Sequence, residues 1–330
     1  MESREKRSRL RQTIAQKRAA LGRLEQQREA AVQELEALKR EFAALESNQS
    51  RADRPSTVEP TTGREKVALY RSLFRGREDI YPTLWTNTKT GRTGYAPACE
   101  NEWVRGVCEK PRVRCGECPN QAFMPMTDQV ILEHLQGRNV VGIYPLLPEE
   151  TCWFLATDFD KGDWEADVAA FRQASEEAGI PVSVERSRSG NGAHAWFFFD
   201  APVPAASTRR MGDLLITHAM SRRHQLDMAS YDRLFPSQDT MPRGGFGNLI
   251  ALPLQREARE HGHTTFIDNS FRPYDNQWSY LASIRKTSRA EVERMASSAA
   301  RCGGVLGVQS SSAEEPELVC RSSESLLSPT

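Results

Sequence analysis

Two aspartates two positions apart are the first residues here whose types and spacing suggest chemistry. The stretch TCWFLATDFD, residues 151–160, predicts a β-strand that ends in Asp158 and Asp160. Side chains two apart on a strand share a face, so both carboxylates lie opposite Phe159. Two such acids repel each other unless a cation lies between them, and a pair of divalent ions satisfies this and aligns a phosphoryl displacement. The alternative is a strand end with solvated acids.

A second stretch, ERSRSGNGAHAWFFFD at residues 185–200, joins a Gly-rich turn to a histidine and an apolar strand. Glycines let backbone amides approach a phosphate, and arginines add positive charge. In this interpretation the histidine donates a hydrogen bond to a phosphate oxygen. The predicted nucleotide-binding residues are Arg186, Arg188, Ser189, Gly190, Asn191, Gly192 and His194. The alternative is a hairpin with a hydrogen-bonded core histidine.

A third carboxylate is expected to complete a metal site with the two aspartates. The stretch SYDRLFPSQDTMPRGGFGNLIALPLQ, residues 230–255, offers Asp232 and Asp239. An aspartate near a proline is also typical of a turn, and that is the alternative for both.

Four cysteines form a cluster within residues 99–118. Eight, six and two residues separate the members of the cluster, which are Cys99, Cys108, Cys115 and Cys118. The Cys-Gly-Glu-Cys knuckle is typical of zinc ligands, and four thiolates make a closed site with a structural role. Buried free thiols are the alternative. No role is assigned to Cys152, Cys302 and Cys320.

The composition argues against a globally basic, a membrane-spanning or a secreted disulfide-rich protein. The 330 residues include 44 basic and 44 acidic side chains, so any nucleic-acid surface must be local. No run approaches the roughly 18 apolar residues of a membrane span, and the N-terminus lacks the apolar core of a secretory signal. Seven cysteines, four of them clustered, suit a reduced compartment better than a disulfide scaffold. We therefore expect a cytoplasmic protein.

The chain divides into four predicted parts. Residues 1–47 predict a long helix whose apolar positions alternate by three and four, the seam of a self-associating coiled coil. Residues 48–63 are polar, contain two prolines and predict a linker. Residues 64–295 predict the compact domain, which includes the cysteine module. The Ser-rich residues 296–330 predict a disordered tail.

Within the compact domain, strands and helices are expected to build one sheet. After the strand at 151–160, Asp163 fits the N-cap of a helix over 164–178, with Gly179 as its end. Two strands then flank the Gly-rich turn, and a helix over roughly 207–226 follows. This order predicts an α+β fold with helices on one face of the sheet. Pairing of strand 193–199 with strand 152–158 would bring His194 near the aspartates.

Residues 64–281 resemble the archaeo-eukaryotic primase domain of the TOTE conflict systems, a group of primase-polymerases. The resemblance covers roughly two thirds of the chain and rests on SLFRGREDIYPTLWTNTKTGRTGYAPACENEW, GIYPLL, DFDK, ERSRSGNGAHAWFFF and SYDRLFPSQDTMPRGGFGNLIALPLQ. It implies a catalytic core with an RRM-like sheet. Such domains are often joined to a helicase and a nuclease, and neither is present in this sequence. Separate proteins of these two kinds are therefore candidate partners.

The resemblance also implies roles for residues. The family's Asp-x-Asp motif falls on Asp158 and Asp160, its histidine motif ends on His194, and its third acid falls on Asp232, with Asp239 in reserve. These matches imply a template-dependent nucleotidyltransferase that starts or extends a nucleic-acid strand from nucleoside triphosphates. Mg²⁺ or Mn²⁺ on the three acids would provide two-metal catalysis, and the zinc module and local basic residues would contact the template or primer.

Two other functions fit the same residues. A metal-dependent nuclease could use the same acids and histidine, and it would release nucleotides without any need of triphosphates. A non-enzymatic zinc and coiled-coil DNA-binding protein of a mobile element would keep its binding after both aspartates are lost, and it would turn over no substrate.

Overall fold

A computed structural model describes residues 6, 13, 16–18, 21, 22, 24, 27, 28, 59–160, 162–222 and 230–301. The chain divides into two units, residues 1–58 and 59–330. Every described residue of the first unit is helical, and its two described leucines, Leu21 and Leu24, are 59% and 61% exposed. The rest of the predicted coiled coil and most of the linker lie outside the described residues, so self-association remains a prediction. Among the described helices, none combines the length and apolar character needed to cross a membrane.

The second unit is built on a four-stranded antiparallel sheet. Its elements follow one another as strand, helix, strand, strand, helix and strand, and the strands lie in the order β5-β6-β4-β7. The bounds are β4 Thr151–Asp160, α4 Trp164–Glu177, β5 Ser183–Arg186, β6 Gly192–Pro204, α5 Ala205–Arg222 and β7 Tyr231–Phe235. This is the RRM-like arrangement, in which the first strand lies between the third and the fourth. The predicted α+β class is therefore confirmed.

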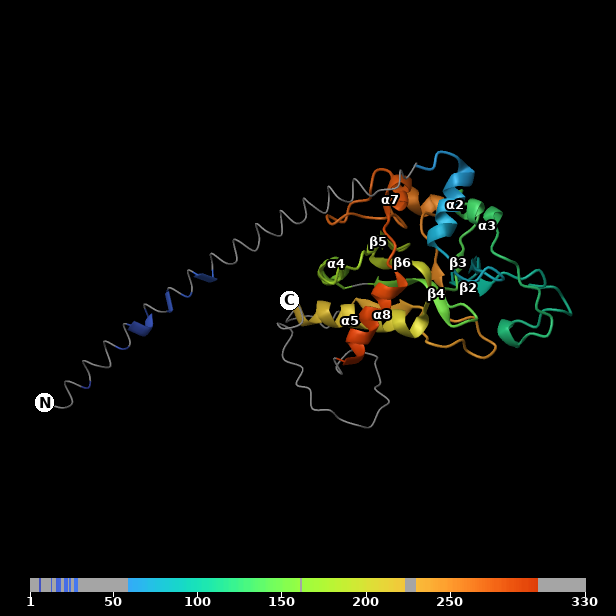
Figure 1. The fold of residues 1–330 in the computed structure, drawn as a ribbon. Coiled ribbons are helices and arrows are strands. Elements are labelled where there is room, and N and C mark those ends of the chain that lie inside the picture. The colour runs from blue at the N-terminus through green and yellow to red at the C-terminus, as the bar shows by residue number, and fades with distance from the viewer. Residues whose placement is uncertain are drawn as a thin grey trace, which may run out of the picture. The chain divides into compact units, whose positions relative to one another are not determined.

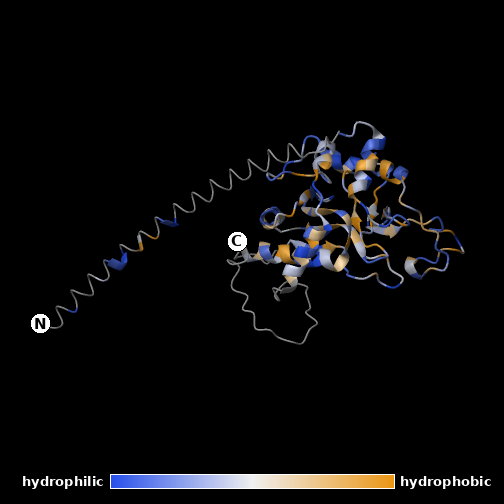
Figure 2. Cartoon of the chain, viewed as in Figure 1, coloured by the Kyte–Doolittle hydropathy of each residue, from blue (hydrophilic) through white to orange (hydrophobic). Residues whose placement is uncertain are grey.

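One face of this sheet packs on α4, α5 and α8, which spans Arg289–Arg301 (Figure 1). Leu155 and Phe159 of β4 point to this side and meet Phe171 of α4 in a buried apolar cluster. Figure 2 shows α5 and α8 with bands of hydrophobic and hydrophilic residues, as expected of helices with only one face on the core. Burial of these side chains provides most of the free energy that holds the helices on the sheet.

The opposite face is covered as well, which corrects the prediction of helices on one face only. Phe154, Trp196 and Phe198 point to this side and pack with Phe74 in a second buried cluster. Both sets of alternating positions in β6 are apolar, so both faces of the strand must be buried. The elements that contribute residues to this cluster are α2 Gly63–Leu73, α3 Asp128–Leu135, β3 Gly142–Ile143, β8 Ile250–Ala251 and α7 Gln277–Ser283. The other elements of the unit are β1 Pro82–Thr86, β2 Thr93–Pro97 and α6 Arg256–Glu260.

The ends of several helices differ from expectation by a few residues. Thr62 caps α2 in a reciprocal hydrogen-bonded box with Glu65, which fixes the start of this helix at Gly63. Helix α8 continues to Arg301, past residue 296, because Ala299 is buried against its neighbours. Asp163 precedes α4, but in the described structure its side chain does not cap the first turn. Residues 302–330 of the predicted tail lie outside the described part.

Candidate active site

Pairing of β4 with β6 places the predicted acids and the histidine together. Asp158 and His194 are direct partners across the two strands, and His194 Nε2 lies 3.6 Å from Asp158 Oδ1. Asp160 is the partner of Gly192, and a Cβ added to this glycine would lie 2.4 Å from the Phe159 carbonyl oxygen. The strands therefore require a glycine at this point, independently of any phosphate. Asp158 and His194 keep side-chain exposures of 21% and 12%, so the pair remains accessible at the edge of the buried layer.

Strand β7 brings a third carboxylate and a cation to the same place. Asp158 pairs with Arg233 and Phe159 pairs with Tyr231, so Asp232 is the extra residue of a β-bulge. The bulge lets Asp232 and Arg233 both interact with Asp158, while Tyr231 packs toward the other face. The Asp232 carboxylate accepts a hydrogen bond from Arg233 Nε at 2.5 Å. Three acids, one histidine and one arginine thus form what we call the acid cluster.

The charges of the acid cluster act on one another. Burial raises the pKa of Asp158, and the nearby carboxylates of Asp232 and Asp160 act in the same direction, although His194 opposes them. Burial alone would lower the pKa of His194, but the carboxylates of Glu185, Asp158 and Asp160 together hold it above its ordinary value. The charged form of Asp158 is therefore disfavoured, and a cation placed beside this carboxylate would stabilise it.

The donors present suit a hard divalent ion that also binds a substrate. Among the described residues, no group of three or more His, Cys, Asp or Glu side chains is already arranged to hold a metal ion. Mg²⁺ is usually held by one or two carboxylates together with water and substrate phosphates, and it does not need a complete protein cage. The oxygen donors of Asp158, Asp160 and Asp232 meet this requirement, so the residues fit Mg²⁺ or Mn²⁺.

Asp239, the reserve for the third acid, has a different environment. Its carboxylate forms an ion pair with Arg209 of α5 at 2.5 Å. The Asp232 carboxylate helps to raise the pKa of Asp158, whereas Asp239 is not among the groups that shift this pKa. The geometry therefore favours Asp232 as the third acid.

Several polar groups of the Gly-rich turn after β5 form hydrogen bonds within the turn itself. The Gly190 amide donates to the Ser187 carbonyl, and the Asn191 amide donates to Ser189 Oγ. Gly190 has φ +76°, and a Cβ at this position would lie 2.3 Å from His263 Nε2, so glycine is required there for two reasons. The turn is therefore a closed hairpin whose amides at 190 and 191 already have acceptors, and this corrects the predicted phosphate cradle.

The two arginines predicted to bind phosphate lie on different sides of the sheet. Arg186 stacks on Trp164 at 5.6 Å and donates to the Phe271 carbonyl at 3.3 Å, on the α4 side and away from His194. Because side chains alternate along β5, Arg186 is directed opposite to Glu185, and its predicted role is wrong for this geometry. Arg188 lies on the His194 side, where its charge acts on Tyr95 and His134. Arg188 Nη1 is buried and has no hydrogen-bond partner within the described parts of the chain.

Most of the chain matches one known protein family. The family described as the TOTE conflict system archaeo-eukaryotic primase domain matches residues 65–295. The chain belongs to this family. None of the curated proteins matches this chain in sequence.

Nine solved chains are similar in structure to this chain, and they include a polymerase domain and a primase-polymerase domain. The first is the polymerase domain of Ligase D from Mycobacterium tuberculosis in complex with DNA, with 16% identity and a TM-score of 0.34. The similarity covers 74% of this chain and 90% of that one. The second is the archaeo-eukaryotic primase domain of the primase-polymerase of cyanophage S-2L, with 14% identity and a TM-score of 0.28, over 57% of this chain and 89% of that one.

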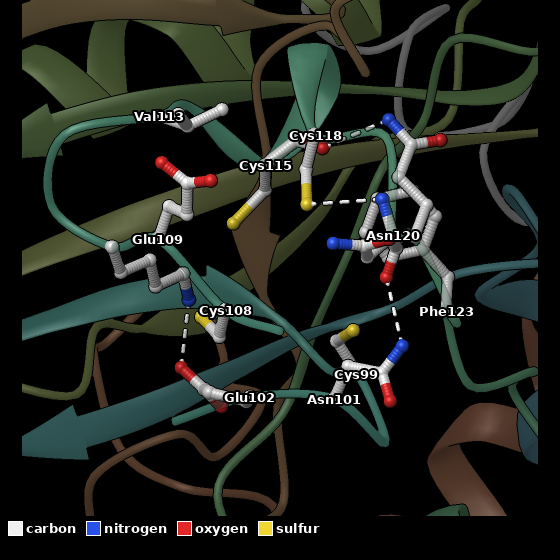
Figure 3. A pocket seen from close by; sticks show the side chains of 12 residues that line it. Cys99, Asn101, Glu102, Cys108, Glu109, Val113, Cys115, Cys118, Asn120 and Phe123 are labelled. Atoms are coloured by element: carbon white, nitrogen blue, oxygen red, sulfur yellow. Dashed lines mark hydrogen bonds and ion pairs between the residues drawn. The ribbon is translucent and has the colours of Figure 1, made fainter. Parts of the chain in front are cut away.

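The predicted zinc ligands of the primase domain gather without forming a metal site. Figure 3 shows Cys99, Cys108, Cys115 and Cys118 on the walls of one pocket, and none of the described cysteines forms a disulfide. The four thiols are not arranged to hold a metal ion among the described residues, so the structure does not support the zinc site as it stands. The short helical turn Cys115–Glu117 fixes only the last two thiols relative to each other, while the long spacings leave the first two on separate turns.

The cysteine module contacts the segment that follows Asp232. A Cβ added to Gly116 would lie 1.7 Å from the Gly244 carbonyl oxygen, so the two backbones are in close contact. The Phe123 and Phe246 rings meet edge to face at 5.2 Å. The module therefore supports the Gly-rich loop between β7 and β8.

Three residues of the site were not predicted from the sequence. Glu185 is buried and hydrogen-bonded to His194, Arg233 lies opposite Asp158, and His263 packs on the Gly190 turn. An acid inside an apolar strand was a usable signal for Glu185. The other two depend on strand register and on a contact between distant segments, for which the sequence holds no comparable signal.

Proposed function

We propose that this primase domain is a template-dependent nucleotidyltransferase that synthesises or extends primers from nucleoside triphosphates. The observation that carries the proposal is the acid cluster: three aspartates on two neighbouring strands, with His194 Nε2 3.6 Å from Asp158 Oδ1. Membership of the primase family supports the same reaction class. A cluster of carboxylates beside a phosphate-binding group suits an in-line displacement at phosphorus.

In this proposal Asp158, Asp160 and Asp232 hold Mg²⁺ or Mn²⁺. When bound, these ions favour the 3′-hydroxyl as nucleophile and neutralise the triphosphate and the leaving pyrophosphate. His194 donates a hydrogen bond from Nε2 to the triphosphate, and Arg188 supplies a charge-assisted bond from the nitrogen that lacks a partner in the described structure. Ser189, Gly190, Asn191 and Gly192 shape the turn that holds these side chains.

We propose that the β1–β2 hairpin and the cysteine module contact single-stranded template. The Trp85 indole lies against Gly94, its partner on β2, and remains 44% exposed. Trp103, in the cysteine module, is 69% exposed, and Lys89 and Arg92 in the hairpin are exposed cations. Exposed indoles offer faces on which unpaired bases stack, and nearby cations bind the phosphates.

The thiols are proposed to bind zinc after moving closer together. Between Cys99 and Pro125, a fully described segment, no residue is buried. A stretch of this length without a core of its own needs a cross-link or a metal to hold its shape. Four thiols on one pocket provide the ligands, and the bound zinc would have a structural role.

An incorporation assay tests the proposed reaction. The purified full chain would be incubated with labelled nucleotides and Mn²⁺ on a primed and on an unprimed single-stranded template. Extension of labelled product on either template supports the proposal, and the comparison separates primer extension from de novo priming. Release of nucleotides from labelled DNA without triphosphates would instead identify a nuclease. Template binding without any turnover would identify a non-enzymatic binding protein.

A further inference from the structure

A buried carboxylate lies directly behind the histidine of the acid cluster. Glu185 of β5 and His194 of β6 are partners across the two strands, and the Glu185 side chain is only 2% exposed. Its Oε2 atom accepts a hydrogen bond from His194 Nδ1 at 2.8 Å and a second one from Trp196 Nε1 at 3.1 Å. One oxygen therefore receives both bonds.

These two bonds connect the histidine to the rigid core. The Trp196 ring is fully buried, stacks on Phe198 at 6.0 Å and meets the edge of Phe74 at 5.1 Å. Its indole nitrogen has a fixed position, so it holds the Glu185 oxygen in place. That oxygen in turn holds the His194 ring through Nδ1, and Nε2 is directed toward Asp158.

Burying the Glu185 carboxylate costs free energy, and the fold does not need a carboxylate at this position. Moving a carboxylate out of water is unfavourable unless hydrogen bonds and charges offset the loss. An apolar residue at position 185 would fit the neighbouring aromatic layer without this cost. A carboxylate that fixes one ring nitrogen so that the other serves a ligand is a recurrent arrangement at functional histidines.

We propose that Glu185 is a positioning residue that orients His194 toward the triphosphate. This inference rests on the proposed function, because the triphosphate is the ligand assigned to His194 Nε2. Glu185 itself touches neither the substrate nor the metal ligands. Its effect on nucleotide binding passes through the histidine, so it should disappear when the histidine is absent.

A double-mutant cycle tests this route. Glu185→Ala should raise the KM for nucleotide roughly ten- to a hundredfold, as expected for loss of a hydrogen bond to a charged group, and leave template affinity unchanged. In a His194→Ala background the same substitution should change KM by less than about threefold, because coupled residues are non-additive. Additive losses, or equal losses of nucleotide and template affinity, would overturn the proposal.

Two further variants separate orientation from general stability. Glu185→Gln keeps an oxygen acceptor at the same place and should retain nucleotide affinity to within a few fold. A loss as large as that of Glu185→Ala would contradict positioning by hydrogen bonding. Ser183→Ala is the matched control, because Ser183 is also buried on β5 and shares the face of Glu185. It should leave KM unchanged, and a similar increase in this control would point to a structural effect of the strand.

A spectroscopic measurement tests the orientation of the His194 ring without relying on enzyme activity. In ¹⁵N-histidine protein, the ring signals of His194, assigned by their loss in His194→Ala, should show a proton on Nδ1 that Glu185→Ala removes or exposes to exchange. An unaltered signal in Glu185→Ala would refute the positioning role even if the enzyme is active. If the native protein incorporates no nucleotide, the proposed function fails, and this spectrum alone decides whether Glu185 orients the histidine.

Discussion

A buried histidine outside the acid cluster should make the stability of the domain depend on acid. His134 of α3 is fully buried, and both of its ring nitrogens have partners in the neutral form. Its Nδ1 accepts from the Val141 amide at 3.2 Å, so the proton must lie on Nε2, which donates to the Pro253 carbonyl at 3.0 Å. The same carbonyl accepts from the Tyr70 hydroxyl at 2.7 Å, which ties α2, α3 and the segment after β8 together.

The size of the effect follows from the change in pKa. Burial lowers the pKa of His134 from the ordinary value of 6.5 to about 4, and the positive charge of Arg188 acts in the same direction. Between these two pKa values His134 is protonated in the unfolded chain and neutral in the folded chain. The stabilisation is fully present above pH 6.5 and is lost as the pH falls toward 4. This linkage amounts to about 2 kcal/mol between pH 7 and pH 5, and to about 3 kcal/mol in total.

Urea unfolding at pH 7 and pH 5, followed by tryptophan fluorescence, measures this loss. Other groups titrate in the same range, so the informative quantity is the difference between the native chain and His134→Gln, which keeps a donor for the Pro253 carbonyl but has no titrating ring. The native chain should lose about 2 kcal/mol more than the variant over this interval. An equal loss in both proteins would refute the neutral, doubly bonded histidine.

Three further variants test the zinc module, the coiled coil and the turn at Gly190. Cys115→Ser should lower the zinc content found by elemental analysis, and native protein without zinc would contradict the proposed module. Deletion of residues 1–58 should give a monomer in light scattering, whereas a monomeric full chain would contradict the predicted coiled coil. Gly190→Ala should lower the free energy of unfolding by about 1–2 kcal/mol, because its φ of +76° and the nearby His263 ring both disfavour a side chain. Unchanged stability of that variant would contradict the closed turn.

Period-two alternation explains which site residues the sequence could predict. It placed Asp158 and Asp160 on one face of a strand with the correct bounds, and the pairing of the strands at 151–160 and 193–199 was also predicted. The same alternation applies to β5. Because Glu185 lies opposite His194, the next residue, Arg186, points to the other face of the sheet. That register is set by pairing between strands and by burial of aromatic rings, which the local sequence does not determine.

The remaining features depend on tertiary contacts. The bulge at Asp232 adds one residue to β7, and local propensity in YDRLF does not distinguish it from a regular strand. The covered second face of the sheet requires α2, α3 and α7, which come from opposite ends of the domain. The choice between Asp232 and Asp239 likewise depends on Arg209, which pairs with Asp239 from α5.

A comparison of acid variants in single-nucleotide incorporation tests whether the acid cluster binds the catalytic metal ions. Asp158→Asn with Asp160→Asn, and Asp232→Asn alone, should each lower the rate at least about a hundredfold, since the charge that holds the metal ions is lost. Burial and neighbouring carboxylates raise the pKa of Asp158, so removing its charge should not lower the melting temperature. Asp239→Asn, the matched control whose carboxylate pairs with Arg209, should keep incorporation within about threefold of the native rate. Native incorporation by the double variant, or a loss in Asp239→Asn as large as in Asp232→Asn, would contradict the assignment of the acid cluster.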